Sequence, residues 1–383
     1  MTEIFLIRHT QAEGNESRMM QGHWDGDITK LGEKQIAALA ERFKDVRIDA
    51  LVSSDLYRTR ATATAITKYH GIEMKTDPRL REIMVGPWET RYFGDIEHES
   101  PELLNKFLFD PENFYFPGIE SYYEVQRRMC AAMFEIAQEN EGKTVAVVSH
   151  GAAIRCFMSY VIGVGFNDKS ALPIFDNTAV SRLVFSAGHF TCDYMNDTSH
   201  LDPISLPEWG KAANLRGEPV DPSRISDLYA RAYRDTWIIS KGSEKGYREE
   251  TYLSAACEHY RTMNESVMEL FDGDVPAGLL DLDVKRGMED NTGWISLLYL
   301  MPEYRGHGCA AQLLSRAEQM YKKLGRRALR LTVSETNEKA VKFYFRSGFE
   351  KISEIKGIGG RLLLLEKSFD KEKQFIIKET ENA

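Results

Sequence analysis

Residues 4–10 read Ile4-Phe5-Leu6-Ile7-Arg8-His9-Thr10, four apolar residues that end on an arginine and a histidine. A short apolar run bounded by polar residues predicts a buried strand. The run at 50–52 ends in Ser53-Ser54-Asp55-Leu56-Tyr57-Arg58, and the run at 145–148 ends in Ser149-His150-Gly151. In open α/β sheets, ligands bind at the carboxyl ends of the strands. We therefore expect these polar residues to meet at one sheet edge.

Helical and strand signals alternate through the first two hundred residues. Amphipathic spacing predicts helices at 29–43, 58–69, 122–140 and 152–161. Short apolar runs predict strands at 3–7, 50–53, 144–148, 180–185 and 190–195. This alternation is typical of a three-layer α/β domain with a largely parallel sheet.

The residues at the predicted strand ends suit phosphate chemistry. Two arginines and two histidines form a cationic pocket for a phosphate dianion. A neutral histidine can attack phosphorus and carry the phosphoryl group, and an acid must then protonate the leaving oxygen. We assign the acid to Glu82, in Leu80-Arg81-Glu82-Ile83. A lone histidine after a strand is more often a structural residue. The hypothesis of a phosphate site therefore depends on the two histidine-bearing strand ends occurring together with the arginine-bearing turn between them.

With these segments in hand, residues 1–195 resemble the histidine phosphatase superfamily, which has the phosphoglycerate-mutase-like fold. Residues 8–15 look like its RHGxTxxN motif, and residues 53–58 look like SSPLxR. Residues 80–89 look like LREIxFGxWEG, and residues 149–151 match its second histidine motif. The four motifs follow one another in the order of the family.

The resemblance implies a role for each matching residue. His9 is the phosphorylated nucleophile and Glu82 the proton donor. The phosphoryl oxygens are held by Arg8, Arg58 and His150, assisted by Asn15, and the pocket is lined in addition by Gln21 and Gly22. Four positions depart from the family pattern without removing a charged group: Thr10, Ala12, Asp55 and Thr90.

The substrate of this domain stays open. The segment between Trp88 and Ser121 carries five aromatic residues, which either contact an organic substrate or form the core of a lid: Phe107, Phe109, Phe114, Tyr115 and Phe116. The domain lacks room for the long insertions of mutases, which favours hydrolysis over phosphoryl isomerisation.

The character of the chain changes after residue 197. Four prolines interrupt a polar stretch without a clear period: Pro203, Pro207, Pro219 and Pro222. We predict a histidine phosphatase domain at 1–200, a linker at 201–222, a second domain at 223–369 and a charged tail at 370–383.

The second domain carries a glycine-rich loop between a predicted strand at 294–300 and a predicted helix at 309–324. The loop reads Arg305-Gly306-His307-Gly308-Cys309-Ala310. Backbone amides at such a turn, together with the helix N-terminus, bind anions, and glycine allows the close approach. Further elements are predicted as helices at 224–237, 248–262 and 338–346, a hairpin at 266–284, and strands at 328–333, 350–355 and 362–366.

Residues 220–367 resemble the GNAT acetyltransferase superfamily, an α+β fold with a mixed sheet. The glycine loop looks like its pyrophosphate loop, and a second cofactor motif is Asn337-x-x-Ala340-x-x-Phe343-Tyr344-x-x-x-Gly348-Phe349. The resemblance implies acetyl-CoA as co-substrate. Its pyrophosphate is bound by Arg305, Gly306, His307, Gly308, Cys309 and Ala310.

The same resemblance assigns the acetyl-transfer residues. Backbone groups of the strand ending at Leu300 contact the thioester, Asn337 contacts the pantetheine arm, and Tyr344 protonates the leaving thiolate. Tyr344 is alternatively a core aromatic residue. The first strand of the fold is not visible before Arg224, so either it is short and irregular or the first domain covers that edge of the sheet. The base stays open among four carboxylates: Glu269, Asp281, Asp283 and Glu303.

Composition limits the partners. The 383 residues are 43% apolar and 28% charged, with a formal net charge of −9. This acidic balance argues against nucleic acid or an anionic membrane as main partner. Five scattered cysteines indicate thiols in a reducing compartment, and neither a secretion signal nor a membrane span is visible. We expect a cytoplasmic protein without a metal.

The sequence thus predicts a bifunctional enzyme. One half hydrolyses a small phosphate ester through phosphohistidine, and the other acetylates a small-molecule or peptide amine. The alternatives are a phosphoglycerate-type mutase, or a ligand-binding sensor or scaffold in which one domain is inactive. The sequence names neither substrate, nor a shared metabolite, nor an oligomeric state.

Overall fold

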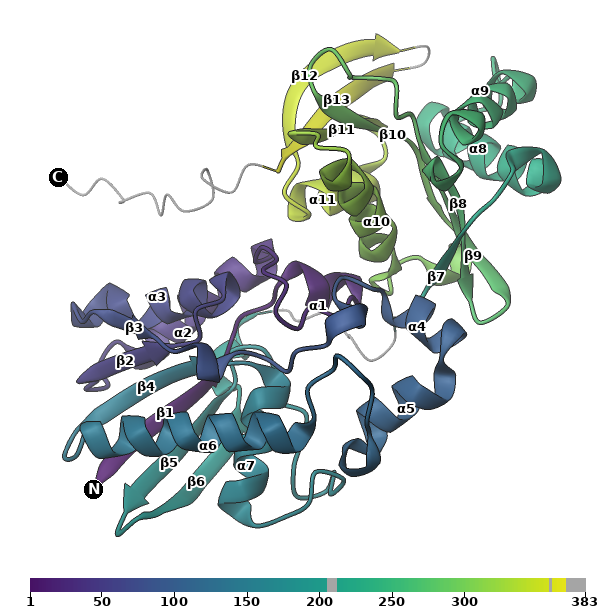
Figure 1. Cartoon of the computed structure of the whole chain (residues 1–383). Coiled ribbons are helices and arrows are strands. Elements are labelled where there is room, and N and C mark those ends of the chain that lie inside the picture. Colours follow the sequence, from purple (N-terminus) through teal and green to yellow (C-terminus); the bar gives the residue numbers. More distant parts are fainter. Residues whose placement is uncertain (205–211, 358–359, 370–383) are drawn as a thin grey trace, which may run out of the picture. The chain divides into compact units, whose positions relative to one another are not determined.

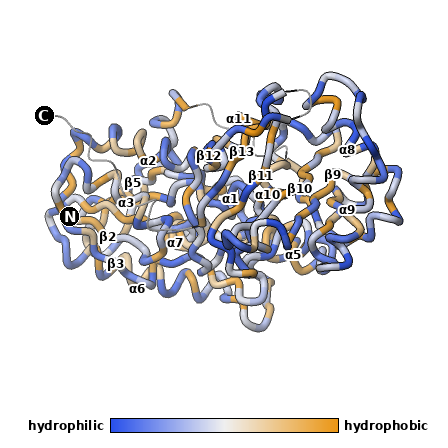
Figure 2. The backbone as a smooth tube through the Cα atoms, turned by 90° about the horizontal axis from the view of Figure 1, so that it is seen from above, coloured by the Kyte–Doolittle hydropathy of each residue, from blue (hydrophilic) through white to orange (hydrophobic). Residues whose placement is uncertain are grey.

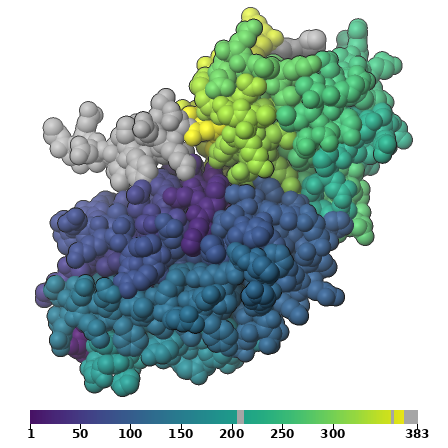
Figure 3. Space-filling view, viewed as in Figure 1, coloured from purple at the N-terminus to yellow at the C-terminus, as the bar shows by residue number. Residues whose placement is uncertain are grey.

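The computed structural model describes residues 1–204, 212–357 and 360–369. The chain divides into two compact units, residues 1–207 and 208–383, which we call the first and second unit. Each unit is one continuous stretch of chain, purple to teal for the first and green to yellow for the second (Figure 3). The predicted tail at 370–383 and part of the predicted linker lie outside the described residues.

The first unit is built on a six-stranded sheet in the order β3-β2-β4-β1-β5-β6. Strands β1 and β2 both pair in parallel with β4, and β3 pairs in parallel with β2. The last two strands run antiparallel. The strands are β1 (Thr2–Arg8), β2 (Ala50–Ser53), β3 (Met74–Thr76), β4 (Thr144–Ser149), β5 (Val180–Ser186) and β6 (His189–Asp197). The predicted, largely parallel sheet is confirmed.

Alternating side chains of β1 face the two helical layers of this unit. Ile4 and Leu6 pack in the cluster that contains α6 (Tyr122–Glu139) and α7 (Gly151–Ile162). Phe5 and Ile7 pack in the cluster that contains α2 (Lys30–Phe43) and α3 (Tyr57–His70). The helices therefore cover both faces of the sheet (Figure 1), and the predicted three-layer architecture is confirmed. Shorter helices are α1 (Glu13–Ser17), α4 (Phe93–Glu99) and α5 (Pro101–Phe109).

The aromatic segment between Trp88 and Ser121 divides into core and surface. Phe107 and Phe114 are buried and pack edge to face, with ring centroids 5.1 Å apart. Phe107 also packs against Trp88 at 5.5 Å. Tyr115 is 78% exposed and Phe109 is 50% exposed. The buried pair therefore forms the core of this segment, and the exposed pair stays accessible.

The second unit contains a seven-stranded mixed sheet in the order β12-β13-β11-β10-β9-β8-β7. β10 pairs in parallel with β11, and the other neighbouring strands pair antiparallel. This confirms the predicted mixed sheet. The strands are β7 (Arg216–Pro219), β8 (Val267–Asp272), β9 (Val275–Leu282), β10 (Thr292–Leu300), β11 (Ala328–Ser334), β12 (Glu350–Gly357) and β13 (Gly360–Ser368).

Two clusters of buried side chains flank this second sheet. One joins Tyr229 of α8 (Ser226–Lys241) and Ala256 of α9 (Glu249–Thr262) to Leu297 of β10. The other joins α10 (Cys309–Lys323) and α11 (Glu338–Arg346) to Ile295, the alternate side of the same strand. In Figure 2, hydrophobic and hydrophilic residues alternate along the helices and strands of both units. Within the described residues, none of the helices combines the length and apolar character needed to cross a bilayer.

Strand β7 lies inside the region predicted as linker. Residues 216–219 pair antiparallel with residues 268–271 of β8. The prediction of a linker over 201–222 therefore differs from the structure at β7. The cause is composition: a four-residue edge strand that ends on Pro219 has no apolar period, and proline is tolerated at such an edge. β7 supplies the first strand that the sequence did not reveal.

Candidate active sites

His9 follows β1 and is 2% exposed. Its Nδ1 lies 2.6 Å from the carbonyl oxygen of Thr10, an atom that only accepts hydrogen bonds. Nδ1 therefore carries the proton, and the lone pair of the neutral ring is at Nε2. Burial, and then the charges of Arg58 and Arg8, hold the pKa of His9 well below 6.5. The neutral ring presents Nε2 as a nucleophile at neutral pH.

His150 follows β4 and is fully buried. Its ring centroid lies 5.1 Å from that of His9. Its Nε2 lies 2.9 Å from Oγ of Ser54, whereas its Nδ1 is buried without a hydrogen-bond partner among the described residues. Burial, and then the charge of Arg58, also hold the pKa of His150 well below 6.5. The second predicted histidine therefore lies beside His9, and its Nδ1 makes no hydrogen bond within the described residues.

Two guanidinium groups complete the first site. Arg58 on α3 is fully buried and donates from Nη1 to the Trp24 carbonyl at 2.9 Å and from Nη2 to the Gly22 carbonyl at 2.8 Å. Burial lowers the pKa of Arg58 to about 10, so the group stays charged at neutral pH. Arg8 donates from Nη1 to the Phe175 carbonyl. A Cβ at residue 151 would lie 3.2 Å from Nε of Arg8, so Gly151 leaves room for this side chain.

Three nitrogen atoms of this site are buried and have no hydrogen-bond partner among the described residues. They are Nε of Arg8, Nε of Arg58 and Nδ1 of His150. A buried polar group without a partner costs about 1–3 kcal/mol. A phosphoryl group would accept short, strong hydrogen bonds from the two charged guanidinium groups, and a neutral one from His150 when Nδ1 carries the ring proton. The donor set therefore fits a phosphate ester beside Nε2 of His9.

Glu82 lies at the N-terminus of α7, which begins directly after His150. Its Oε1 accepts from the amides of Ile83 and Ala153, both at 3.0 Å, and its Oε2 accepts from the amide of Ala152 at 3.2 Å. Burial lowers the pKa values of Arg8 and Arg58, and the negative charge of Glu82 opposes this lowering in both. The structure thus brings the predicted proton donor to the site of the two histidines, although the two segments are 70 residues apart in sequence.

The weaker candidates surround the same site. Oδ1 of Asn15 accepts from the amide of Ala12 at 3.0 Å. Gln21 lies against Gly14, where a Cβ would come within 2.1 Å of its Cγ, and its Oε1 is buried without a partner among the described residues. Gly22 has a φ of 47° and reaches the site through its carbonyl, which accepts from Arg58.

In the second unit, β10 and β11 separate along their length. Among the described residues they pair only at 292–294 and 328–330, although β10 continues to Leu300 and β11 continues to Ser334. A gap bordered by strand backbone therefore opens toward the carboxyl ends of these strands. A shift in register between Ile295 and Leu297 marks a β-bulge beside the gap.

The glycine loop after β10 fits an anion. Gly306 and Gly308 have φ values of 86° and 82°, and a Cβ at Gly306 would meet no atom within 4 Å. The amides of residues 306–308 donate to no backbone carbonyl in the described part of the chain, and the loop is exposed. Gly308 caps the N-terminus of α10, while Cys309 is buried behind it and Ala310 is half-buried. Free amides before a helix N-terminus are suited to pyrophosphate, so these residues fit the predicted role.

The side chain of Arg305 turns back onto β10. Its Nε donates to the Leu300 carbonyl at 2.9 Å, and its guanidinium lies 5.2 Å from the ring centroid of Tyr299. Leu300 is itself paired with Gly278 of β9. The Leu300 carbonyl, which is predicted to contact the thioester, therefore already accepts a hydrogen bond from Arg305.

Asn337 and Tyr344 lie on the unit that follows β11. Oδ1 of Asn337 accepts from the amide of Ala340 at 3.3 Å, which caps α11 and leaves its Nδ2 able to donate. Tyr344 is 8% exposed and packs at 5.4 Å against the ring of Phe349. Burial raises the pKa of Tyr344, so the phenol keeps its proton. Tyr344 therefore packs as a core aromatic residue, and its protonated phenol is also chemically able to donate a proton.

Comparison with known proteins matches both units. The profile of the histidine phosphatase superfamily (branch 1) matches residues 4–198, and the profile of the acetyltransferase (GNAT) family matches residues 224–349. The chain belongs to the histidine phosphatase superfamily. It carries a GNAT acetyltransferase domain in its second unit, so both units come from enzyme families.

Relatives of the histidine phosphatase domain cover the first unit. The proteins named "Probable phosphoglycerate mutase GpmB" of Yersinia enterocolitica and Escherichia fergusonii are 33% and 32% identical over 213 residues. Each match covers 54% of this chain and 99% of the relative. The solved structure of Bacillus stearothermophilus YhfR is 28% identical with a TM-score of 0.51, and the match covers 53% of this chain and all of that one.

Two departures from the histidine phosphatase motifs have a structural explanation. The Thr10 hydroxyl points to α2, where it donates to the Gly32 carbonyl at 2.7 Å, so the extra side chain is directed to α2. Asp55, which stands where the family has proline, accepts from Nε of Arg81 at 2.6 Å. This ion pair joins the loop after β2 to the residue before Glu82.

Several residues at the first site were not found from the sequence. Asn177 donates from Nδ2 to the His9 carbonyl at 2.9 Å, and Thr178 donates from its amide to the carbonyls of Arg8 and His9 at 3.1 and 3.3 Å. Arg128 of α6 donates to backbone carbonyls of the segment that ends at Glu82. None of the three lies in a recognisable motif, and all act from segments distant in sequence.

The second unit contains a polar cluster around His259 that includes two of the four candidate bases, Asp281 and Asp283. Asp281 is 1% exposed, and its carboxylate accepts from the Tyr229 hydroxyl and lies 2.6 Å from Nδ1 of His259. His259 and Asp283 line a cavity of about 120 Å³. Although burial opposes it, the hydrogen bond to Asp281 raises the pKa of His259. The sequence pointed to Asp281 and Asp283 but not to this histidine. No group of three or more potential metal ligands is found among the described residues.

Proposed function

We propose that the chain is a bifunctional enzyme that hydrolyses a phosphomonoester through a phosphohistidine and transfers acetyl from acetyl-CoA to an amine. The observation that carries the first activity is the set of three unpartnered buried nitrogens beside the neutral ring of His9. The second activity is supported by the separated strands β10 and β11 and by the amides of residues 306–308, which donate to no backbone carbonyl in the described part of the chain. Five cysteines without a disulfide among the described residues suit a cytoplasmic protein.

Phosphoryl transfer then proceeds in two steps. Nε2 of His9 attacks phosphorus, the ester P–O bond breaks, and the leaving oxygen takes a proton from Glu82. Arg8, Arg58 and His150 donate to the oxygens on which negative charge gathers. In the second step water attacks the phosphohistidine, returns a proton to Glu82 and releases phosphate, which restores the lone pair on His9.

Hydrolysis is proposed over isomerisation because the segment that follows Glu82 is short. Between Trp88 and Ser121 the elements described are the helices α4 and α5 and the short 3-10 helix Pro111–Asn113, packed on an aromatic core. The relatives named as probable phosphoglycerate mutases make the mutase the second candidate. Incubation with 3-phosphoglycerate separates them, because a mutase moves the phosphoryl group between hydroxyls whereas a phosphatase releases inorganic phosphate.

In the acetyltransferase unit, the amides of residues 306–308, within the loop at 305–310, would hold the pyrophosphate of acetyl-CoA. When bound, acetyl-CoA supplies an activated thioester. Asn337 has a free donor for the pantetheine arm, and Tyr344 carries a phenolic proton suited to the leaving thiolate. Acidic side chains around His259 favour a cationic amine as acceptor, either a small molecule or a peptide.

The full chain is tested for both reactions at once. Phosphate release is measured over a panel of phosphate esters, and thiol release from acetyl-CoA is measured over a panel of primary amines. His9→Ala should abolish phosphate release and leave acetyl-CoA binding unchanged. A chain that binds both ligands without turning over either is a sensor or scaffold, and that result would overturn the proposal.

A further inference from the structure

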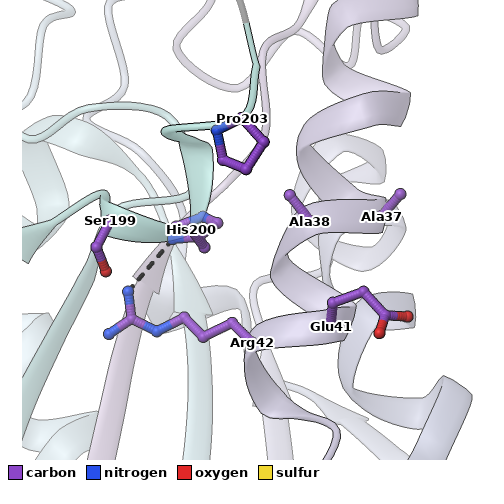
Figure 4. Close-up of a pocket in the computed structure, with 7 residues that line it drawn as sticks. All are labelled: Ala37, Ala38, Glu41, Arg42, Ser199, His200 and Pro203. Atoms are coloured by element: carbon purple, nitrogen blue, oxygen red, sulfur yellow. Dashed lines mark hydrogen bonds between the residues drawn. The ribbon is translucent and has the colours of Figure 1, made fainter.

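A surface hollow of about 550 Å³ lies between α2 and the short turn at Ser199–Leu201. Figure 4 shows its lining, which comes from α2 on one side and from the turn on the other: Ala37, Ala38, Glu41, Arg42, Ser199, His200 and Pro203. A hydrogen bond joins Arg42 to His200 across its floor (Figure 4). This bond is the outer end of a chain that leads to the phosphate site.

The direction of every hydrogen bond in this chain follows from Arg42. A guanidinium only donates, so Nδ1 of His200, 3.3 Å from Nη1 of Arg42, accepts. The proton of the neutral His200 ring is then on Nε2, which donates to Oγ1 of Thr178 at 3.0 Å. The Thr178 hydroxyl in turn donates to the Asn177 carbonyl at 2.7 Å. Burial lowers the pKa of His200 to about 4, which keeps the ring neutral as this order requires.

The anchor at the outer end is itself fixed. Nη2 of Arg42 lies 2.7 Å from a carboxylate oxygen of Asp197, and its Nη1 also donates to the Asp197 carbonyl at 3.3 Å. Nη2 additionally donates to the Tyr194 hydroxyl at 3.2 Å. Residues of β6 therefore hold Arg42 in one orientation. The hydrogen bond from Arg42 in turn fixes the orientation of the His200 ring.

Thr178 has a φ of 59°, a left-handed conformation that a β-branched residue rarely adopts. Such a conformation persists only where the surroundings hold it, and it concentrates at functional sites. Here His200 binds the Thr178 hydroxyl from outside, while the Thr178 amide donates inward to the carbonyls of Arg8 and His9. The strained residue is thus held between the outer anchor and the predicted nucleophile.

The turn at residues 175–178 contacts the phosphate site at several atoms. The Phe175 carbonyl accepts from Nη1 of Arg8, and Nδ2 of Asn177 donates to the His9 carbonyl at 2.9 Å. That carbonyl belongs to the same peptide as the amide of Thr10, which donates to Oγ1 of Thr62 at 2.8 Å. The peptide after His9 is therefore fixed at both ends, and the imidazole is fixed in turn by its bond to the Thr10 carbonyl.

We propose that Asn177, Thr178 and His200 are positioning residues, which hold the His9 ring in line with the phosphoryl group during transfer. This inference rests on the proposed role of His9 as nucleophile. None of the three needs to touch the substrate. A displacement of about 1 Å at a reacting group costs about 100-fold in rate, so small shifts of this peptide are sufficient to matter. Their loss should weaken binding of the transition state more than binding of a ground-state ligand.

The experiment compares orthovanadate, which mimics the transferring phosphoryl group, with inorganic phosphate, by calorimetry on the full chain. Asn177→Ala and His200→Ala should lose about 10- to 100-fold in orthovanadate affinity, with a much smaller change for phosphate. His200→Gln should keep most of the affinity, because the amide accepts from Arg42 and donates to Thr178. Asn167→Ala is the matched control, since Asn167 is exposed and donates to Asp110 at 2.8 Å.

Thr178→Gly separates positioning from folding. Glycine relieves the left-handed strain, so the melting temperature should hold or rise, while loss of the hydroxyl link should lower orthovanadate affinity. Unchanged orthovanadate affinity in Asn177→Ala and His200→Ala would overturn the proposal. An equal loss of both ligands together with a lower melting temperature would also overturn it, as a purely structural effect. If the wild-type chain binds orthovanadate no better than phosphate, the proposed function of His9 fails instead.

Discussion

Arg128 donates from Nη2 to the backbone carbonyl of Glu82 across 2.9 Å. Its Nη1 donates to the carbonyls of Arg79 and Arg81 at 2.7 and 2.5 Å, and its Nε and Nη2 pair with the Glu120 carboxylate at 2.7 and 2.9 Å. One side chain of α6 therefore holds three carbonyls of the segment that carries the predicted proton donor. This arrangement fixes the backbone at Glu82 without touching its carboxylate.

Replacing Arg128 should impair the acid step more than the attack. Arg128→Gln is expected to slow cleavage of alkyl phosphates, whose leaving groups need a proton, more than cleavage of 4-nitrophenyl phosphate. Arg128→Lys should behave in the same way, because a lysine cannot reproduce the planar fork. Arg127→Gln, an exposed neighbour on the same helix, serves as the control. Steady-state rates on the two ester classes measure the effect, and an equal loss on both classes would contradict it.

Glu82→Gln tests the proton donor itself. The amides of Ala152 and Ala153 donate to separate oxygens of Glu82, so the variant keeps an acceptor for one of them and carries no acidic proton. Alkyl esters should be cleaved about 10²–10⁴-fold more slowly, the usual contribution of a general acid. Aryl esters should lose much less, because their leaving groups depart as anions. If the loss is the same for both, Glu82 does not donate the proton.

The buried histidines predict how stability depends on pH. Burial lowers the pKa values of His9 and His150 in the folded chain, whereas unfolding returns both to about 6.5. Below pH 6.5 the unfolded chain therefore binds more protons than the folded chain. The free energy of unfolding of the first unit should fall as pH decreases below 6.5 and be regained as pH rises.

Urea denaturation between pH 7 and pH 5 measures this dependence, followed through the indole signal of the buried Trp88 in a chain whose four other tryptophans are replaced by phenylalanine. His150→Gln should reduce the slope, because one of the groups that takes up a proton on unfolding is gone. His98→Gln replaces an exposed histidine and should leave the slope unchanged. A flat profile for the wild-type chain would show that the buried rings do not resist protonation.

The sequence was sufficient for the parts of the phosphate site that lie at strand ends. His9 and His150 follow short apolar runs that predict buried strands, and parallel pairing of β1 with β4 places the two histidines side by side. It was not sufficient for contacts that depend on tertiary placement. Asn177 and Thr178 lie in an irregular stretch before β5, and Arg128 is one of two adjacent arginines on α6, so no local pattern distinguishes them.

In the second unit, too, local sequence patterns predicted some features, whereas contacts that depend on tertiary placement were missed. The glycine loop and the helix after it were readable because backbone approach requires glycine at 306 and 308. His259 escaped notice because its partner Asp281 comes from a different element, 22 residues along the chain. Similarly β7 was missed because a short edge strand needs little apolar periodicity, and its partner β8 is what defines it.

The glycine loop predicts the behaviour of a substitution at Gly308. This residue has a φ of 82° and caps α10, so a valine there adds a branched side chain where an anion must approach the backbone. Acetyl-CoA affinity should collapse in Gly308→Val, measured by calorimetry, while phosphate release persists. Gly325→Val is the matched control, since Gly325 has a φ of 70° just beyond the other end of α10. Wild-type affinity in Gly308→Val would exclude the loop as the binding site.

The last prediction concerns where the second unit can be cut. β7 pairs with β8, and Gln312 of α10 donates to the Ala213 carbonyl at 2.7 Å while accepting from the Leu215 amide at 2.9 Å. Leu215 is fully buried and Gln312 is 1% exposed. A fragment of residues 205–383 keeps these contacts, so we expect it to be soluble and to bind acetyl-CoA, with residues 1–204 binding orthovanadate separately.

A fragment of residues 224–383 keeps the span matched by the acetyltransferase profile but loses β7 and the residues that pair with Gln312. It leaves the edge of β8 open and the buried Gln312 amide without its partners, and an open edge of this kind promotes aggregation. We expect it to be insoluble or poorly folded, as judged by gel filtration and circular dichroism. Equal behaviour of the two fragments would show that β7 is dispensable. An insoluble 205–383 fragment that is rescued by co-expression with 1–204 would show instead that the two units depend on each other for folding.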